Sequence, residues 1–334
     1  MKKRILFGLV ALTMVLSLLL SGCGDKQPEN KIDTVRVCEV THSIFYAPQY
    51  VAIAKGFFAE ENIEIELSNG GGADKVMSAV LSNSVDIGLA GPEASVYVYN
   101  SGKEDYPEVF AQLTACDGSF LVAREPNENF EWSQLKGTHI LPGRKGGVPY
   151  MAFRYAMEKN GLNPDADANL DNTIQFDMMT GAFLSGTGDY VTMFEPVASS
   201  VQMEGKGYIV ASVGAEAGSM PYTAYFSKKS YIAENSDLIQ RFTNAITKGQ
   251  QWVAEHSAEE IAASVQSFFA DTDAALLASA VQSYKDIGAY AQTPVMTKEG
   301  FDRLQEVIQR AGELEKTAPF EKLINNTFAE KAMQ

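Results

Sequence analysis

The sequence predicts an α/β protein of two lobes, each built on a parallel-rich sheet flanked by helices. Three observations lead to this class. About 310 residues follow an N-terminal export signal, which is more than one hydrophobic core comfortably organises. Strand and helix patterns alternate in two successive blocks, which is typical of parallel-rich sheets. In each block, two strands end in a short turn and a proline that suits the start of a helix.

The export signal occupies residues 1–22. A basic start is followed by an uncharged apolar run from Ile5 to Leu20, which is shorter than the roughly 20 residues of a membrane span. Small residues then end the segment, as in a secretory signal. The ending Leu20-Ser21-Gly22-Cys23 resembles the lipobox of bacterial lipoproteins, which implies cleavage before Cys23, lipidation of that residue and an extracytoplasmic, membrane-anchored location. The alternative is an ordinary signal peptide that carries a cysteine near its cut site. Residues 23–32 are polar and form the expected lipidated tether.

The net charge excludes one class of partner. The whole chain has 27 basic and 42 acidic residues. Three of the basic residues and none of the acidic ones fall in 1–22, so removing them leaves a net charge near −18. A chain this acidic repels nucleic acid and anionic lipid headgroups. The charge gives no information about the ligand.

Two cysteines remain in the folded part. Cys38 lies in a strand-like run and Cys116 follows far along the chain, with no close pair that suggests a metal or redox motif. The two could form a disulfide outside the cell or remain separate buried thiols, and we favour the second.

The first block begins with a strand and a helix. The apolar spacing from Tyr50 to Phe57 is helical, and Gly56 provides a stop signal. Alternation with period two marks the next strand. The expected strands are Thr34–Val40, Ile63–Leu67, Val85–Leu89, Val109–Thr114 and Phe120–Ala123, with helices from Pro48 to Gly56, from Asp74 to Leu81 and from Pro92 to Gly102.

The second block repeats this pattern and then becomes helical. Its expected strands are Thr138–Leu141, Thr173–Phe176, Tyr190–Phe194, Tyr208–Val213 and Thr223–Phe226. Helices are expected from Pro149 to Asn160, from Met178 to Leu184 and from Pro196 to Gly205, and then over Asn235–His256, Ser257–Phe269, Asp273–Ile287 and Lys298–Gly312. We expect the helices after Asn235 to pack on the first lobe.

The four helix starts at Pro48, Pro92, Pro149 and Pro196 predict a binding cleft. In open α/β sheets, ligands bind beyond the carboxyl ends of strands, where these turns lie. Free N–H groups at helix starts also favour negative charge. Aromatic faces, hydrogen-bond acceptors and a planar donor surround the turns. The candidate ligand-binding residues are Phe45, Tyr46, Gly91, Glu93, Arg144, Gly146, Gly147, Tyr190, Glu195 and Tyr222. We assign Phe194 to the core.

Several short motifs, in this order, resemble a known family. They are Phe45-Tyr46-Ala47-Pro48, Ala54-Lys55-Gly56-Phe57-Phe58, the run 84–90, Leu135-Lys136-Gly137-Thr138 and Phe194-Glu195-Pro196. The chain resembles solute-binding lipoproteins of ABC importers, in the branch that handles nitrate, alkanesulfonates, taurine and thiamine-pyrimidine precursors. The resemblance implies a type II periplasmic-binding-protein-like fold that closes over one small molecule and delivers it to an ABC permease.

The expected lobes share the chain unequally. Residues 33–118 and 219–334 form lobe I, and residues 119–218 form lobe II. Chain crossings near 116–123 and 212–222 serve as the hinge. A monomer suits this role.

The residues leave the ligand open. In the pyrimidine-precursor members of the family, a carboxylate at the position of Glu195 recognises the heterocycle, whereas the sulfonate-binding members usually have Asp there. With the aromatic residues, this implies an aromatic heterocycle. Arg144 and the helix starts favour instead an anion such as an alkanesulfonate, taurine or nitrate.

An enzyme and a tethered sensor subunit are the two alternative classes of function. A eukaryotic pyrimidine synthase shares the fold and uses a cysteine-rich run, a histidine and a lysine-bound cofactor. This chain has no cysteine cluster, and His42, His139 and His256 are too scattered to suggest a metal site. We therefore expect no catalytic residues, no cofactor and no metal, although His42 could reach the cleft. A tethered sensor subunit is the other alternative.

Overall fold

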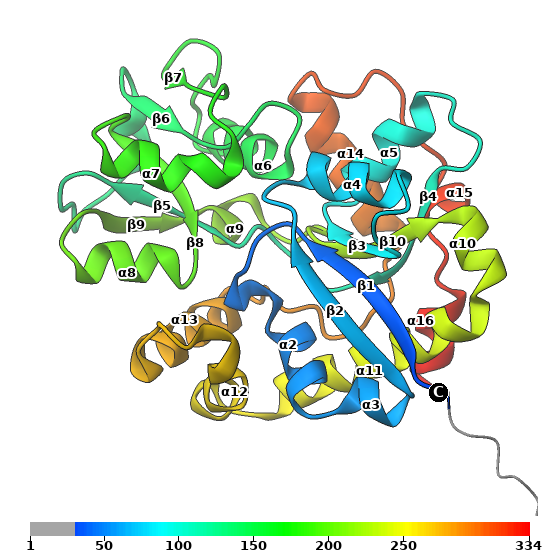
Figure 1. The fold of residues 1–334 in the computed structure, drawn as a ribbon. Helices are drawn as coiled ribbons and strands as arrows, with labels where there is room; N and C mark the ends of the chain where they lie inside the picture. Colours follow the sequence, from blue (N-terminus) through cyan, green and yellow to red (C-terminus); the bar gives the residue numbers. More distant parts are fainter. Residues whose placement is uncertain (1–30) are drawn as a thin grey trace, which may run out of the picture. The chain divides into compact units, whose positions relative to one another are not determined.

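The computed structural model describes residues 31–334. The predictions for the signal peptide, for Cys23 and for most of the tether lie outside the described residues. Asp33–Gln334 form one compact unit that holds two five-stranded sheets (Figure 1). Within the described part, no helix is both long and apolar enough to cross a membrane.

The first sheet has the strand order β2-β1-β3-β10-β4. Its strands are β1 (Asp33–Glu39), β2 (Ile63–Asn69), β3 (Ile87–Ala90), β4 (Pro107–Gln112) and β10 (Ala224–Lys228). The first three are parallel, and β10 is antiparallel to both β3 and β4. We call this sheet and the helices packed on it the first lobe.

The second sheet repeats this arrangement in the order β7-β6-β8-β5-β9. Its strands are β5 (Ser119–Ala123), β6 (His139–Leu141), β7 (Asn169–Leu170), β8 (Tyr190–Phe194) and β9 (Tyr208–Ser212). Here β5 is the antiparallel strand, paired with β8 and β9. This sheet and its helices are the second lobe. The predicted two-lobed α/β class is confirmed, and the lobe boundaries at 118/119 and 218/219 stay a prediction.

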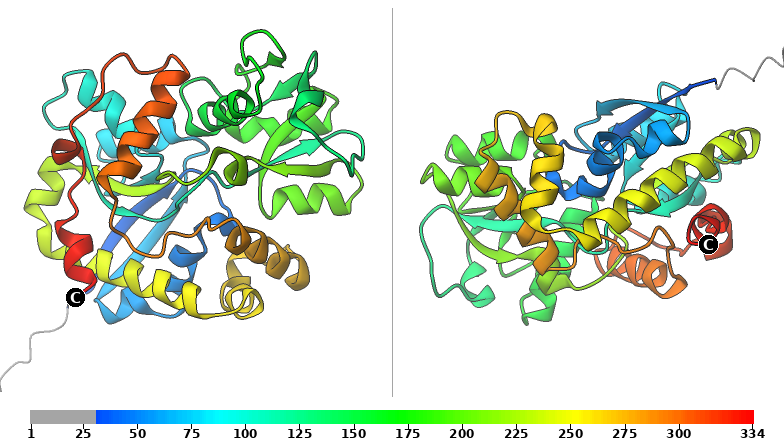
Figure 2. Two further views of the ribbon diagram at one scale, coloured as in Figure 1. Left: turned by 180° about the vertical axis from the view of Figure 1, so that it is seen from behind. Right: turned by 90° about the horizontal axis from the view of Figure 1, so that it is seen from below.

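Helices enclose both sheets (Figure 2). In the first lobe, α2 and α3 pack with α11 on one side of the sheet, and α4 and α5 lie on the other (Figure 1). The helices of this half are α2 (Ala47–Ala54), α3 (Phe57–Glu60), α4 (Ala73–Leu81), α5 (Glu93–Asn100), α10 (Lys229–Glu234), α11 (Ser236–Glu255), α12 (Ala258–Val265), α13 (Ala274–Asp286), α14 (Lys298–Arg310), α15 (Phe320–Leu323) and α16 (Thr327–Ala332).

The second lobe carries α6 (Val148–Lys159), α7 (Met179–Leu184), α8 (Val197–Met203) and α9 (Val213–Ala217). Short 3-10 helices complete the chain: η1 (Ile44–Tyr46), η2 (Trp132–Leu135), η3 (Phe176–Met178) and η4 (Gln266–Phe269). The four proline turns open α2, α5, α6 and α8, as predicted. Proline fits there because the first N–H groups of a helix have no internal partner.

One detail of the sequence prediction was wrong. The strand expected over 173–176 is absent, because the Asp171 carboxylate accepts hydrogen bonds from the backbone N–H (3.1 Å) and the hydroxyl (2.6 Å) of Thr173 and turns the chain. The strand of this region lies earlier, at β7. The helices after Asn235 do pack on the first lobe, where α11 and α12 contact α2, and in addition α14 contacts α6 and α13 contacts α8.

The two chain segments that pass between the sheets lie side by side. Leu113 N–H donates to the Thr223 carbonyl (2.9 Å), and Met220 N–H donates to the Ala115 carbonyl (2.9 Å). At Gly214, an added Cβ would lie 1.9 Å from the Asp117 carbonyl oxygen, so only glycine permits this close approach. The paired segments fit the hinge that the sequence predicts.

Candidate functional site

A small cavity of about 40 Å³ lies where strand ends of the two sheets meet. Both lobes supply its walls. The lining residues are Val40, Thr41, Tyr46, Gly72, Ala73, Gly91, Glu93, Arg144, Gly147, Val148, Pro149, Phe176, Phe194, Tyr222 and Thr223. Since one water needs roughly 10–15 Å³ of free volume, the cavity accommodates a few waters or the core of a small ligand. We call it the inner cavity.

Two wider chambers adjoin the inner cavity. The outer chamber, of about 510 Å³, shares Thr41, Phe176 and Phe194 with it. A side chamber, of about 410 Å³, shares Glu93 and Arg144 with it. The inner cavity therefore shares wall residues with two larger and more open chambers.

The inner cavity has aromatic walls. Tyr46 and Tyr222 are nearly fully buried, and the Phe194 ring lies 6.3 Å from the Tyr222 ring, centroid to centroid. Phe176 meets Phe194 edge-on at 5.8 Å. Phe45 contacts the Tyr46, Phe194 and Tyr222 rings from behind and does not line the cavity. Phe45 therefore supports the wall, whereas the flat faces available to a ligand belong to its neighbours.

Glu93 supplies a buried acid to this apolar space. It is the first residue of α5, and its side chain is 1% exposed. Its Oε2 atom has no hydrogen-bond partner among the described residues. Burial raises the pKa of Glu93 to about 7, although nearby backbone N–H groups and the charge of Arg144 act in the opposite direction. The charge of Glu93 in turn contributes to the raised pKa of Tyr46, Tyr97 and Tyr222.

Arg144 is already engaged by the protein. Its Nε lies 3.1 Å from Oδ1 of Asp74, at the start of α4 in the first lobe. Its Nη1 donates to the Lys145 carbonyl at 3.0 Å. Gly147 lines the inner cavity, whereas Gly146 lines the side chamber, where its carbonyl accepts a hydrogen bond from the Tyr97 hydroxyl (3.2 Å).

Glu195 also has its carboxylate occupied. One oxygen accepts from the Ser199 backbone N–H at 3.0 Å, and the other accepts from the Ser199 hydroxyl at 2.7 Å, which caps α8. Burial raises the pKa of Glu195, and Ser199 lowers it. Glu195 lines the outer chamber and not the inner cavity.

Tyr190 lies away from the site. It begins β8, whereas the chambers are at the other end of this strand, and it packs against Phe130 with ring centroids 6.1 Å apart. Sequence reasoning also missed Phe176 and the Gly72–Ala73 turn, and it placed Phe194 in the core. The turn after β2 could have been found from its place at a strand's carboxyl end.

Buried hydrogen bonds join the lobes beside the cavity. The Ser43 hydroxyl donates to the Glu195 carbonyl at 2.5 Å. The Tyr284 hydroxyl, from α13, accepts from the Glu195 backbone N–H at 2.8 Å and donates to the Gly118 carbonyl at 3.0 Å. On the surface, Lys75 Nζ pairs with Asp177 Oδ2 at 2.9 Å. The two lobes are thus in direct contact beside the cavity and at the surface.

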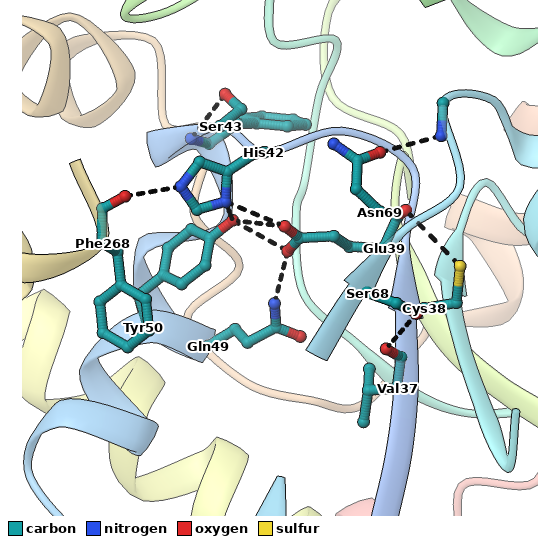
Figure 3. Close-up of polar contacts among 12 residues, drawn as sticks. Val37, Cys38, Glu39, His42, Ser43, Gln49, Tyr50, Ser68, Asn69 and Phe268 are labelled. Atoms are coloured by element: carbon teal, nitrogen blue, oxygen red, sulfur yellow. Dashed lines mark hydrogen bonds and ion pairs between the residues drawn. The ribbon is translucent and has the colours of Figure 1, made fainter. Parts of the chain in front are cut away.

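A second polar cluster supports the wall of the outer chamber (Figure 3). Buried Glu39 accepts hydrogen bonds from Gln49 Nε2 (2.8 Å) and from the Tyr50 hydroxyl (2.8 Å), and its Oε1 lies 3.2 Å from His42 Nδ1. His42 Nε2 donates to the Phe268 carbonyl at 2.8 Å. Burial raises the pKa of Glu39, and hydrogen bonding to Glu39 raises that of His42. His42 also lines the outer chamber. Its hydrogen bond to Phe268 connects the loop after β1 to η4.

Other site chemistry is limited. Within residues 31–334, no group of three or more His, Cys, Asp or Glu side chains could hold a metal ion. Cys38 and Cys116 are both buried and unpaired, as separate thiols.

Comparison with known proteins gives consistent results. Residues 44–260 match the NMT1/THI5-like family. YtlA of Bacillus subtilis (strain 168), whose name describes binding and specifies no ligand, is 44% identical over 319 residues, which cover 96% of this chain and 95% of YtlA. The 4-amino-5-hydroxymethyl-2-methylpyrimidine phosphate synthase of Candida albicans (strain WO-1) is 22% identical over 233 residues, which cover 64% of this chain and 65% of that enzyme.

Among solved structures, the alkanesulfonate-binding protein SsuA from Xanthomonas axonopodis pv. citri, bound to MOPS, is similar with a TM-score of 0.73. The two chains are 13% identical, and the match covers 89% of this chain and 99% of SsuA. At this identity the similarity establishes a shared fold.

Proposed function

Because the chain belongs to the NMT1/THI5-like family, we propose that it is the substrate-binding protein of an ABC importer. It captures a small molecule between its lobes and delivers that molecule to a membrane permease. The observation that carries this proposal is the inner cavity, whose walls come from strand ends of both sheets. A ligand held there contacts both lobes at once. It therefore binds the closed arrangement more tightly than the open one and stabilises the closed arrangement.

The proposed location is outside the cytoplasmic membrane. The lipobox-like ending at Cys23 supports a lipid anchor on that residue, and lipid of more than one acyl chain gives stable attachment. The protein then acts as a tethered monomer beside its permease. A sensor subunit would have the same anchor and cleft, and loss of ligand import on deletion of the gene separates import from sensing.

The finer proposal concerns the ligand. Tyr46, Tyr222, Phe176 and Phe194 provide flat surfaces that suit an aromatic heterocycle, such as a thiamine pyrimidine precursor. A small anion such as a sulfonate or nitrate is the second candidate, supported by the helix starts of α5 and α6 at the cavity. The engagement of Arg144 by Asp74 weakens this second candidate, since it leaves less positive charge for an anion.

We propose binding rather than catalysis. The relative that is similar over nearly the whole chain is named as a binding protein, and the relative that is named as an enzyme is only 22% identical. The sequence also has no cysteine-rich run. A synthase activity would appear as chemical change in a bound pyrimidine, which mass spectrometry after incubation detects.

A thermal-shift panel of pyrimidines, flavins, sulfonates, nitrate and amines tests capture. A ligand at 100 times its Kd stabilises the folded state by about 2.7 kcal/mol, so the unfolding midpoint should rise by several degrees. A panel in which no compound shifts the midpoint would count against the proposed function.

A further inference from the structure

Glu93 lines the inner cavity and has an unfilled hydrogen-bonding capacity. Glu93 is only 1% exposed, and its buried Oε2 atom has no hydrogen-bond partner among the described residues. An unpaired buried carboxylate oxygen costs about 1–3 kcal/mol or more. Glu195 has both oxygens paired by Ser199. Glu93 and Glu195 therefore differ, and of these two acids it is Glu93, at the inner cavity, that keeps a free acceptor.

The backbone before Glu93 accommodates this position of the carboxylate. If Gly91 carried a Cβ, that atom would lie 1.9 Å from Glu93 Oε2 and 2.6 Å from Cδ. Both contacts are far inside van der Waals distance, so any larger residue at 91 would displace the carboxylate. Glycine at this position lets the acid fold back over the turn that leads into α5.

The cationic side chain at the cavity does not satisfy Glu93. Among the described residues that line the inner cavity, Arg144 is the one Lys, Arg or His side chain. Its Nε pairs with Asp74, and its Nη1 donates to the Lys145 carbonyl. The remaining wall is mainly aromatic and aliphatic. The described residues that line the inner cavity therefore supply no charge-assisted hydrogen bond to Glu93 Oε2, so a bound ligand could supply one.

We infer that Glu93, held in place by Gly91, determines specificity and selects a ligand that donates N–H hydrogen bonds, either a cation or a neutral amine-bearing group. This inference rests on the proposed function, because it assumes that the ligand binds in the inner cavity. A planar donor can stack on the Tyr46 and Tyr222 side while it pairs with Glu93 Oε2. A simple anion in the same place lies beside an unpaired carboxylate and is disfavoured.

Matched pairs of small cations and anions test which charge the inner cavity prefers. Guanidinium and nitrate are both planar with four heavy atoms and opposite charge, and so are acetamidinium and acetate. Each is titrated at constant ionic strength by calorimetry into a protein that comprises residues 23–334. We expect guanidinium and acetamidinium to bind more tightly than nitrate and acetate. Preferential binding of the anions, or no measurable binding of either cation at millimolar concentration, overturns the inference.

Variants then test whether Glu93 is responsible for this preference. Glu93→Gln keeps the shape and should weaken acetamidinium binding roughly 10- to 100-fold, as expected for one charge-assisted hydrogen bond. Gly91→Ala should weaken it as well, because it displaces the carboxylate. Glu60→Gln, which removes a negative charge on α3 where Glu60 pairs with Lys248, should leave binding unchanged. Circular dichroism verifies that each variant is folded.

The outcomes separate this inference from the proposed function. If a sulfonate or nitrate stabilises the wild type and Glu93→Gln binds it as well or better, the inference fails while capture between the lobes stands. If nothing in the wider ligand panel binds, the proposed function fails. If acetamidinium binds equally to the wild type and to Glu93→Gln, Glu93 does not determine specificity.

Discussion

Replacement of Tyr284 by Phe should loosen closure of the lobes without disturbing either sheet. The hydroxyl of this side chain on α13 connects two backbone groups, the Glu195 N–H of the second lobe and the Gly118 carbonyl of the hinge. Tyr284 is fully buried, so water does not readily replace the lost bonds. Each unsatisfied buried group costs about 1–3 kcal/mol, which gives about 2–6 kcal/mol for the pair.

Part of this cost falls on closure alone. We expect opening of the lobes to separate Tyr284 from Glu195, so that bond contributes to the closed state and not to the open one. Its loss should shift the balance toward opening by about 1–2 kcal/mol, or roughly 5- to 30-fold in apparent ligand affinity. Calorimetry with a compound from the ligand panel measures the affinity, and small-angle scattering measures the ligand-free radius of gyration, which should increase.

Tyr290→Phe is the matched control. The Tyr290 hydroxyl donates to the Ile44 carbonyl at 3.0 Å, and both residues belong to the first lobe. This variant should lower the unfolding midpoint while ligand affinity stays within about twofold of the wild type. Equal affinities for the Tyr284→Phe and Tyr290→Phe proteins would refute the reasoning, because the Tyr284 hydroxyl would then contribute to stability alone.

Three other predictions address the acids and the anchor. Glu93 and Asp117 both have a pKa raised by burial to about 7, so the folded state binds more protons than the unfolded state between about pH 4 and pH 7. The unfolding midpoint of the ligand-free protein should therefore fall as pH rises through this window, and it should fall less steeply in the Glu93→Gln variant. A midpoint that rises with pH in this window contradicts the assignment. Glu195→Gln should cost about 1 kcal/mol of stability by weakening the cap of α8 and should reduce affinity less than Glu93→Gln does; a larger loss at Glu195 would return it to the ligand site. Cys23→Ala should move the protein from the membrane fraction to the soluble fraction, and retention in membranes would disprove the lipid anchor.

Local rules explain why the fold could be read from the sequence. Proline at the first turn of a helix requires little tertiary information, so the starts of α2, α5, α6 and α8 were predictable. The long C-terminal helices were predictable from their apolar periodicity; α12, for example, starts at the capping box formed by Ser257 and Glu260. The expected strand at 173–176 failed because a side-chain turn at Asp171 overrides β propensity there.

The site was predicted less completely, since its residues depend on how the lobes meet. Position at a strand's carboxyl end indicated Tyr46, Glu93 and Tyr222 as site candidates, and all three line the inner cavity. The same rule did not show that the Glu195 carboxylate binds Ser199. Nor could it show that Phe176, in a short 3-10 helix, reaches across to the cavity. The position of Phe176 depends on contacts between segments distant in sequence, which residue spacing does not encode, whereas the Glu195–Ser199 pair is a local helix cap that the strand-end rule does not consider.

The central claim is that one small molecule binds between the two lobes. A crystal structure of residues 23–334 with the compound that stabilises the protein most in the thermal-shift panel tests it most directly. We expect the compound in the inner cavity, in contact with Tyr46, Glu93 and Tyr222 and enclosed by both lobes. A compound bound on the outside of one lobe, with the inner cavity unchanged, would contradict the claim.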